Sequence, residues 1–248
     1  MRNRPALTDV LVAGLADLGI MATAVPTQEK RVKLWLVTAW HALDPGALEM
    51  LSQAERARAA RFASSQLSDR YIAAHVALRW MMERRVGIAA HMQHYEAGPH
   101  GKPWLRGYPE ASFNLSYAGS RLLIGMAAGG ALGVDIEQLR QVEDAAALAA
   151  LYYSVREREA LASCQPGSDR FDQMFLSIWT RKEACVKATG LGLGEFALPR
   201  IECGHADSRA VRVGYRQLRT DTTLLDQGYL LSWSWDRIGQ YEGQAVEN

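Results

Sequence analysis

Residues 179–193 read WTRKEACVKATGLGL, the end of an amphipathic helix that runs into a glycine-punctuated loop. The helix starts near Phe171, and at about 100° per residue its apolar side chains form one continuous face. Lys182 projects into the middle of that face, while Glu183 and Lys187 lie at its edge. Burying an unpaired ammonium costs several kcal/mol, so Lys182 must find an anion or a route to water.

Glu183 and Lys187 also allow a simpler interpretation. Residues four apart on a helix form surface ion pairs that contribute only a few tenths of a kcal/mol. This interpretation does not account for Lys182, and it remains open beside a functional one.

The composition indicates a globular protein and argues against several other classes. The chain has 248 residues, 48% of them hydrophobic and 22% charged, with a net charge of +1. No global field therefore favours nucleic acid or an anionic membrane, and no apolar run approaches the roughly 20 residues of a membrane span. The three cysteines show no CxxC spacing, so we expect buried thiols in a cytoplasmic protein. Residues 9–25 predict a short packed helix rather than a signal peptide.

The order of the predicted elements indicates two similar lobes. A strand at 33–40 precedes helices at about 52–62 and 67–85, and short strands follow between 92 and 138. Helices return at 144–153, 154–163 and 171–189, before strands at 209–218 and 229–235. Helices followed by strands, twice over, predict an α+β fold. We place the lobes at residues 1–131 and 132–248.

The segment GVDIEQL, residues 133–139, places two carboxylates on one face of a strand. Asp135 and Glu137 are two residues apart, so their side chains point the same way while Val134 and Ile136 face the core. Most such pairs are solvated strand edges. Joined by Glu183, they form a three-carboxylate set suited to Mg²⁺, with Lys187 and Lys182 available to a bound phosphate.

Two further segments carry candidate ligand-binding residues. Between residues 52 and 85 there are seven arginines and three acids, and Arg58 and Arg61 share a helix face. Solvated arginines on a surface helix are the alternative for this segment. The turn GPHGKPWL presents Lys102, and FNLSYAG, residues 113–119, alternates apolar and polar side chains before a glycine. A plain hairpin is the alternative there.

In this order the motifs resemble a known family. RxxRF, DRxxxxHxxLR, GKPxL, FNxSxxG, GVDIE and WTxKEAxxKxxGxGL are similar to the two-lobed, surfactin-activating (Sfp-type) class of 4'-phosphopantetheinyl transferases. The resemblance runs from about Arg58 to Leu193. It implies a pseudo-dimer of two α+β lobes with the site in the cleft between them. It also implies a cytoplasmic, monomeric enzyme that binds neither nucleic acid nor membrane.

The resemblance also implies an activity. Enzymes of this family transfer phosphopantetheine from coenzyme A to a serine of an acyl or peptidyl carrier protein, as in polyketide or nonribosomal peptide biosynthesis, and release 3',5'-ADP. Asp135, Glu137 and Glu183 would hold Mg²⁺, and Lys187 would bind the pyrophosphate and protonate the leaving group. Glu183 or Glu137 would take the serine proton.

Other coenzyme A contacts are implied for residues of both lobes. Arg58, with Arg61 or Arg70, would lie near the 3'-phosphate. Lys102 would border the adenine and Ser116 the phosphates, and Lys182 belongs to the same signature.

One position departs from the family pattern FNxSHxxG. Tyr117 stands where the family has a histidine that helps to bind the phosphates, and a neutral phenol brings no positive charge. Tyr117 therefore supports an alternative, a coenzyme A-binding homologue with weak or no transfer that acts as a regulator or carrier-protein scaffold. The acidic triad favours the enzyme. A Mg²⁺-dependent phosphohydrolase unrelated to coenzyme A is disfavoured by the GKP and arginine-rich segments.

Overall fold

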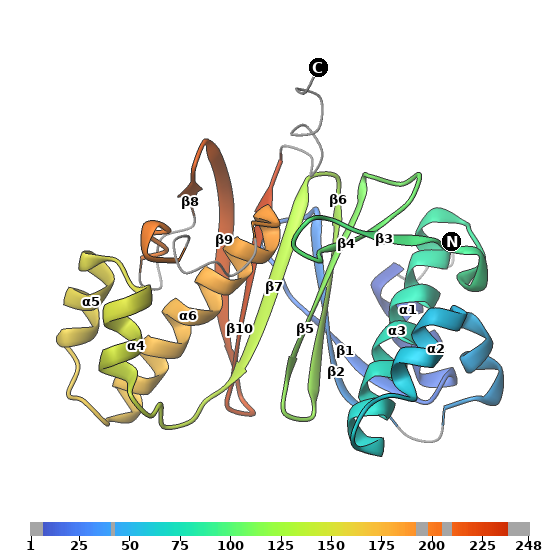
Figure 1. The fold of residues 1–248 in the computed structure, drawn as a ribbon, viewed down its shortest axis with the longest axis horizontal. Helices are drawn as coiled ribbons and strands as arrows, with labels where there is room; N and C mark the ends of the chain where they lie inside the picture. The colour runs from blue at the N-terminus through green and yellow to red at the C-terminus, as the bar shows by residue number, and fades with distance from the viewer. Residues whose placement is uncertain (1–6, 41–42, 192–197, 205–209, 238–248) are drawn as a thin grey trace, which may run out of the picture.

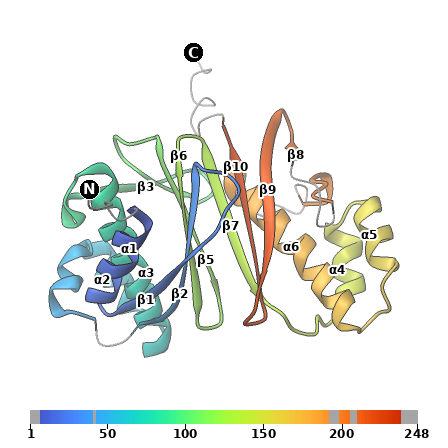
Figure 2. The same ribbon diagram turned by 180° about the vertical axis from the view of Figure 1, so that it is seen from behind.

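The computed structural model describes residues 7–40, 43–191, 198–204 and 210–237. Two four-stranded antiparallel sheets lie at the centre of the molecule, with helices α1–α3 outside one sheet and α4–α6 outside the other (Figures 1 and 2). The last two residues of the WTxKEAxxKxxGxGL signature lie outside the described residues.

The first lobe holds the sheet β1-β2-β6-β5. Its elements are α1 (Leu7–Asp17), β1 (Ile20–Val25), β2 (Val32–Trp40), η1 (Pro45–Met50), α2 (Gln53–Ala59), α3 (Ser65–Val86), η2 (Ala90–Met92), β3 (Tyr95–Ala97), β4 (Pro103–Leu105), β5 (Ala111–Ala118) and β6 (Arg121–Ala128). β3 and β4 form a separate hairpin. The second lobe holds the sheet β7-β10-β9-β8. Its elements are β7 (Ala131–Gln138), α4 (Ala145–Tyr152), α5 (Val155–Ala162), α6 (Asp169–Thr189), η3 (Leu198–Arg200), β8 (Ala210–Val213), β9 (Arg216–Leu225) and β10 (Tyr229–Asp236).

The two lobes share a strand order, which confirms the predicted α+β fold of similar halves. In the first lobe, β2 precedes the helices and then pairs with β6, the second strand of the β5–β6 hairpin. In the second lobe, β7 precedes the helices and pairs with β10, the second strand of the β9–β10 hairpin. β1 and β8 each extend one sheet by a further strand.

Helix ends follow the signals in the sequence. Ser52 caps α2 and forms a capping box with Glu55, and Ser154 with Glu157 does the same for α5. Gly190 ends α6 in the left-handed conformation at φ 72°, where glycine is favoured.

The N-terminal segment differs from the prediction. The sequence predicts a short helix over residues 9–25, but α1 ends at Asp17, and β1 begins at Ile20 after Gly19 with φ 81°. β1 alternates buried and exposed residues at the edge of its sheet, a pattern short enough to be hidden in an apolar run.

Side chains of both sheets build a core between the lobes. It includes Val32, Leu34, Leu36 and Leu123 from the first sheet and Leu132, Val134, Ile136, Leu231 and Trp233 from the second. Apolar burial of this extent holds the two lobes together as one unit.

The edge strands β5 and β7 meet through side chains rather than a strand ladder. The Ser112 Oγ accepts a hydrogen bond from the Leu132 amide at 3.1 Å, and the Asn114 Oδ1 accepts one from the Val134 amide at 2.8 Å. Ser112, Asn114 and Ser116 are all buried. The alternation along β5 therefore directs a row of small polar side chains at β7 and fixes how the lobes meet.

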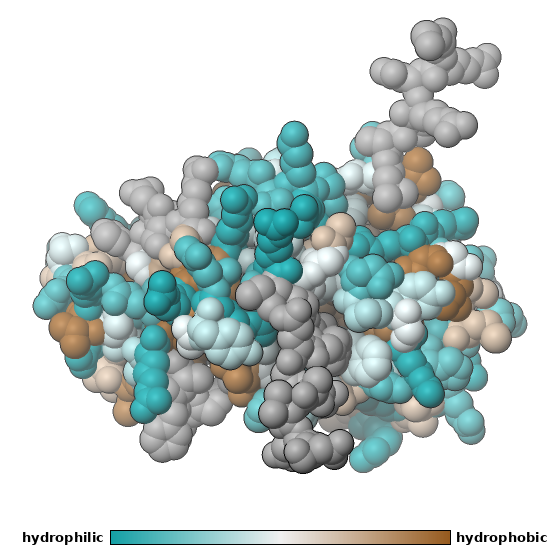
Figure 3. All heavy atoms as spheres, turned by 90° about the horizontal axis from the view of Figure 1, so that it is seen from above, coloured by the Kyte–Doolittle hydropathy of each residue, from teal (hydrophilic) through white to brown (hydrophobic). Residues whose placement is uncertain are grey.

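The surface fits the globular composition. Seen from above, hydrophilic side chains dominate and apolar ones form small separate groups (Figure 3). Within the described part of the chain, no helix has both the length and the hydropathy needed to cross a membrane. Cys164, Cys185 and Cys203 are buried free thiols, as predicted.

Candidate active site

Asp135 lies at the junction of the two lobes. Its Oδ1 accepts hydrogen bonds from the Ser116 Oγ at 2.8 Å and from the Lys187 Nζ at 2.6 Å. Its Oδ2 is buried, and in the part of the chain that the structure describes it has no hydrogen-bond partner. Burial raises the pKa of Asp135, while the Lys187 ammonium and the Ser116 hydroxyl oppose that rise. An unpartnered buried carboxylate oxygen is a position that a cation would fill.

Gly133 brings α6 into direct contact with β7. A Cβ at this position would lie 2.0 Å from the Ala184 carbonyl oxygen and 2.3 Å from the Ala188 nitrogen. These are backbone atoms that cannot move aside, so the close approach requires glycine. Because Glu183 and Lys187 directly precede Ala184 and Ala188, the same contact holds both side chains near Asp135.

Glu183 and Glu137 complete the acidic cluster. Burial, followed by the charge of Asp135, raises the pKa of Glu183 to about 7, and the Lys187 ammonium partly offsets this effect. Glu137 is turned toward Arg140, with which it forms an ion pair at 2.7 Å. The three carboxylates are therefore close enough to repel one another.

The acidic cluster fits Mg²⁺ in chemistry but is not arranged around one ion. Three carboxylates, one with an unpartnered oxygen, are the hard oxygen donors that Mg²⁺ prefers. Among the described residues, however, no three acidic, histidine or cysteine side chains converge as ligands of one ion. Lys187 occupies one oxygen of Asp135 and Arg140 occupies Glu137. Because Arg140 contacts only the Oε2 of Glu137, metal binding would require the three side chains to turn toward one point, and not the loss of this ion pair.

Glu183→Gln is expected to stabilise the metal-free protein at pH 8, with a much smaller effect at pH 5. The folded-state pKa of about 7 lies above the ordinary value of 4.5, so the folded chain loses stability as pH rises between these values. Glutamine removes this loss, and we expect Tm to rise by a few degrees at pH 8. Thermal melts at both pH values would check this, with exposed Glu143→Gln as the control. An unchanged Tm at pH 8 would contradict the electrostatic account.

Comparison with known proteins identifies the family. A family model described as the 4'-phosphopantetheinyl transferase superfamily matches residues 131–240. The slr0495 protein of Synechocystis sp., named as a candidate 4'-phosphopantetheinyl transferase, is 31% identical over 229 residues, which cover 87% of this chain and 92% of that protein. The chain belongs to the 4'-phosphopantetheinyl transferase superfamily.

Two further members of the superfamily match shorter stretches. The 4'-phosphopantetheinyl transferase psf-1 of Bacillus pumilus is 30% identical over 159 residues, or 62% of this chain and 66% of that protein. The 4'-phosphopantetheinyl transferase HetI of Nostoc sp. is 32% identical over 148 residues, or 58% of this chain and 62% of that protein.

Lys182 of this transferase does not lie in the acidic cluster, which corrects the expected phosphate contact. Its side chain is fully buried and its ammonium forms an ion pair with Glu157 at 2.7 Å. The ammonium also donates to the carbonyls of Leu198, at 2.8 Å, and of Ile201. Glu157 accepts a hydrogen bond from the Cys203 amide at 2.7 Å. Glu157 is therefore the anion that a buried Lys182 requires. Through these contacts Lys182 links α6 to α5 and to residues 198–203.

The predicted arginines lie on the outer side of the first lobe. Arg58 and Arg61 are exposed on and just after α2, and they line a cavity of about 490 Å³. The Arg58 guanidinium lies 5.4 Å from the centre of the Tyr71 ring. Arg70 donates to the Gly119 carbonyl at 2.9 Å. We call Arg58, Arg61 and Arg70 the arginine cluster. In the described part of the chain, none of these three guanidinium groups forms an ion pair with a carboxylate.

Ser116 and Tyr117 face opposite sides of β5. Ser116 points to Asp135, while the Tyr117 ring lies under the Arg70 guanidinium, 5.1 Å from ring centre to carbon. Burial raises the pKa of Tyr117 to about 12, against the opposing charge of Arg70. The phenol is thus neutral near pH 7 and belongs to the arginine cluster, not to the acidic one.

The Lys102 ammonium bonds to the main chain of the second lobe. It donates to the carbonyls of Leu132 at 2.9 Å and Ala188 at 3.0 Å, main-chain atoms of the second lobe. It therefore bridges β7 and α6 by bonding one main-chain carbonyl of each.

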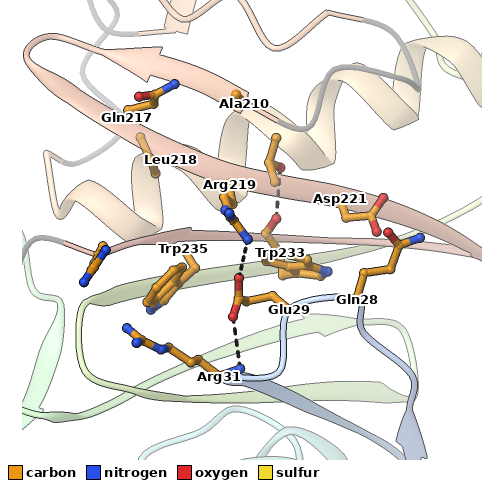
Figure 4. Close-up of a pocket in the computed structure, with 12 residues that line it drawn as sticks. Gln28, Glu29, Arg31, Ala210, Gln217, Leu218, Arg219, Asp221, Trp233 and Trp235 are labelled. Carbon is orange, nitrogen blue, oxygen red and sulfur yellow. Dashed lines mark hydrogen bonds and ion pairs between the residues drawn. The ribbon is translucent and has the colours of Figure 1, made fainter.

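A larger cavity, of about 800 Å³, is lined by different residues from those of the acidic cluster (Figure 4). It lies between the turn after β1 and the strands β9 and β10. Across it the Arg219 guanidinium forms an ion pair with Glu29 at 2.7 Å, and Arg31 lies over the Trp235 ring (Figure 4). None of the predicted carboxylates lines this cavity, so we read it as part of the contact between the lobes.

Some residues that build the site were missed by sequence reasoning. Glu157 carried a signal, because Ser154 three residues earlier marks a capping box. For Asn114 and Ser112 the only signal in the sequence was the alternation of apolar and polar residues around the FNLS segment. Gly133 had no signal of its own, since glycine in a strand has several explanations.

Proposed function

We propose that the chain transfers the 4'-phosphopantetheine group of coenzyme A to a serine hydroxyl of an acyl or peptidyl carrier protein and releases 3',5'-ADP. The observation that carries the proposal is Asp135, whose Oδ1 accepts from Lys187 and whose Oδ2 meets no hydrogen-bond partner among the described residues. Membership of the superfamily supplies the class of reaction.

Asp135, Glu137 and Glu183 would hold Mg²⁺ in this proposal. When bound, the ion supplies Lewis-acid stabilisation of the charge that develops on the pyrophosphate oxygens. The protein contributes the position of its ligands, which the contact at Gly133 fixes. The raised pKa of Glu183 supports cation binding, because a positive charge would relieve the repulsion among the carboxylates.

Lys187 would bind the pyrophosphate from the opposite side. Its side chain is only partly buried, and its ammonium can turn from Asp135 to a phosphate oxygen. In the transition state it would stabilise charge on the leaving group and donate a proton to the departing ADP oxygen.

A carboxylate would accept the proton of the attacking serine. Glu183 and Glu137 are both within the acidic cluster, and either could act as the base. The serine oxygen forms the new bond to phosphorus as the bond to the ADP oxygen breaks.

Arg58→Ala is expected to weaken binding of coenzyme A more than binding of its 3'-dephospho analogue. A charge-assisted hydrogen bond contributes roughly 1.5–3 kcal/mol, so the preference should fall by about tenfold or more. Calorimetry of both ligands would measure it, with Arg84→Ala in the last turn of α3 as the matched control. An unchanged preference would place the 3'-phosphate elsewhere.

The carrier protein would approach the same junction from solvent. Carrier proteins are generally acidic, and the arginines between residues 56 and 85 form the most basic segment of the chain. Some of these arginines would meet the 3'-phosphate and others the carrier protein. A cytoplasmic location would suit the free cysteines.

The direct test is the nucleotide product. The protein, coenzyme A, Mg²⁺ and an apo acyl carrier protein should yield one 3',5'-ADP for each carrier protein modified, measured by liquid chromatography. Binding of coenzyme A without release of 3',5'-ADP would overturn the proposal and favour the scaffold alternative suggested by Tyr117.

A further inference from the structure

The Lys102 ammonium spans the line along which α6 rests on β7. Its two acceptors are the carbonyls of Leu132 and Ala188, at 2.9 and 3.0 Å. Leu132 directly precedes Gly133, and the Ala188 nitrogen is one of the atoms that a Cβ on Gly133 would strike. Lys102 itself comes from the β3–β4 hairpin of the other lobe. One side chain of the first lobe thus bonds both elements of the second lobe at their point of closest contact.

The end of α6 is held by a cation from each lobe. Lys102 binds the Ala188 carbonyl, and the Arg216 Nη1 donates to the next carbonyl, that of Thr189, at 3.3 Å. Arg216 is in turn paired with Asp236. The last carbonyls of a helix have no partner within the helix and carry partial negative charge, so cations bind there favourably.

The Lys102 stem runs beside the helix cap. Its Cδ lies 3.7 Å from the position that a Cβ on Gly190 would take. The stem therefore passes the cap before the ammonium reaches its two carbonyls. This geometry fixes the last turn of α6, which carries Lys187.

We propose that Lys102 is a positioning residue that locks α6 onto β7 and so sets the distance between Lys187 and Asp135. The inference deepens the proposed function and rests on it for its kinetic part. It differs from the adenine contact expected from the sequence, because the ammonium is committed to main-chain carbonyls. A misplacement of about 1 Å at a reacting centre can cost on the order of 10²-fold in rate, so a lock of this kind has a measurable effect.

Titration of Lys102 gives a second readout. Burial, and then the charge of Arg216, lower the pKa of Lys102 to about 7 from 10.5. Between these values the unfolded chain holds the proton and the folded chain has lost it, so the folded state gains stability as pH rises through this window. The neutral amine still has two N–H groups for its two carbonyls. Arg216, its partner Asp236 and Lys187, in the same last turn, are charged groups at this end of α6.

The test compares Lys102→Met with Lys30→Met, an exposed lysine that serves as the control. For Lys102→Met we expect kcat to fall about tenfold, with the KM for coenzyme A changed by less than about twofold. The gain in Tm between pH 7 and 10 should shrink relative to the wild-type protein. Hydrogen exchange of the amides of residues 187–190 should become faster.

The opposite pattern would overturn the inference. A raised KM for coenzyme A with unchanged kcat and unchanged exchange would assign Lys102 to the ligand instead. If Lys102→Met is unfolded at the assay temperature, Lys102→Gln, which keeps an N–H donor on a shorter stem, takes its place with the same expected split. If the wild-type protein transfers nothing, the proposed function fails, and hydrogen exchange alone tests the positioning role of Lys102. Amide exchange at residues 187–190 that is the same in Lys102→Met and the wild-type protein would then reject that role.

Discussion

Asp135→Ala is expected to abolish transfer, with a fall in single-turnover rate of at least about 10³-fold. Asp135 is the residue on which the acidic cluster depends. Its Oδ1 holds both the Lys187 ammonium and the Ser116 hydroxyl, and its Oδ2 is the buried oxygen left for a cation. Removing the carboxylate would take away the proposed metal ligand and the ion-pair partner of Lys187 together.

Asp135→Asn separates charge from shape. The amide keeps the size of the side chain and can still contact Ser116, but it is a poor Mg²⁺ ligand. We expect both variants to fold, since burial already raises the pKa of Asp135 and the carboxylate is costly to hold there. Circular dichroism would check the fold and rapid-quench assays the rate. Turnover of Asp135→Asn close to that of the wild-type protein would remove Asp135 from the metal site.

Lys187→Ala is expected to lower kcat by on the order of 10²–10³. Its ammonium lies 2.6 Å from the Asp135 Oδ1 and 3.1 Å from the Ser116 Oγ, inside the junction of the lobes. This position argues against a plain surface pair with Glu183. A phosphate-binding ammonium contributes most when charge builds on the leaving group, so kcat should change more than the KM for coenzyme A.

The matched control for this variant is Lys30→Ala, an exposed lysine outside the junction. Lys187→Ala also leaves Asp135 without its ion-pair partner, so Tm should fall, and rates must be compared below the melting temperature of the variant. A drop of less than about threefold in single-turnover rate would restore the surface interpretation.

The predictable part of the fold was the part with strong periodicity or a capping signal. The helix near Phe171, the helix that begins near Ser52 and the strand GVDIEQL all have local causes, and the structure places them as predicted. Repetition of helices and strands was enough to predict two similar lobes. β1 was missed because its few residues follow an apolar helix without a strong break.

The sequence predicted which residues belong to the candidate site better than it predicted which way their side chains point. A helical wheel places Lys182 on a buried face, but it does not say which element covers that face. The C-terminal half of α6 is buried on nearly every side, so Lys182 and Glu183, adjacent in sequence, meet different partners. Lys102 shows the same limit, because its partners come from the other lobe and lie far away in sequence.

The central claim is transfer of phosphopantetheine to a carrier-protein serine through Asp135. The measurement that tests it most directly is the intact mass of an apo acyl carrier protein after incubation with coenzyme A, Mg²⁺ and this protein. We predict a mass increase equal to one phosphopantetheine group, absent with Asp135→Ala and absent when alanine replaces the acceptor serine. An acceptor of unchanged mass, with folded wild-type protein present in stoichiometric amount, would contradict the account.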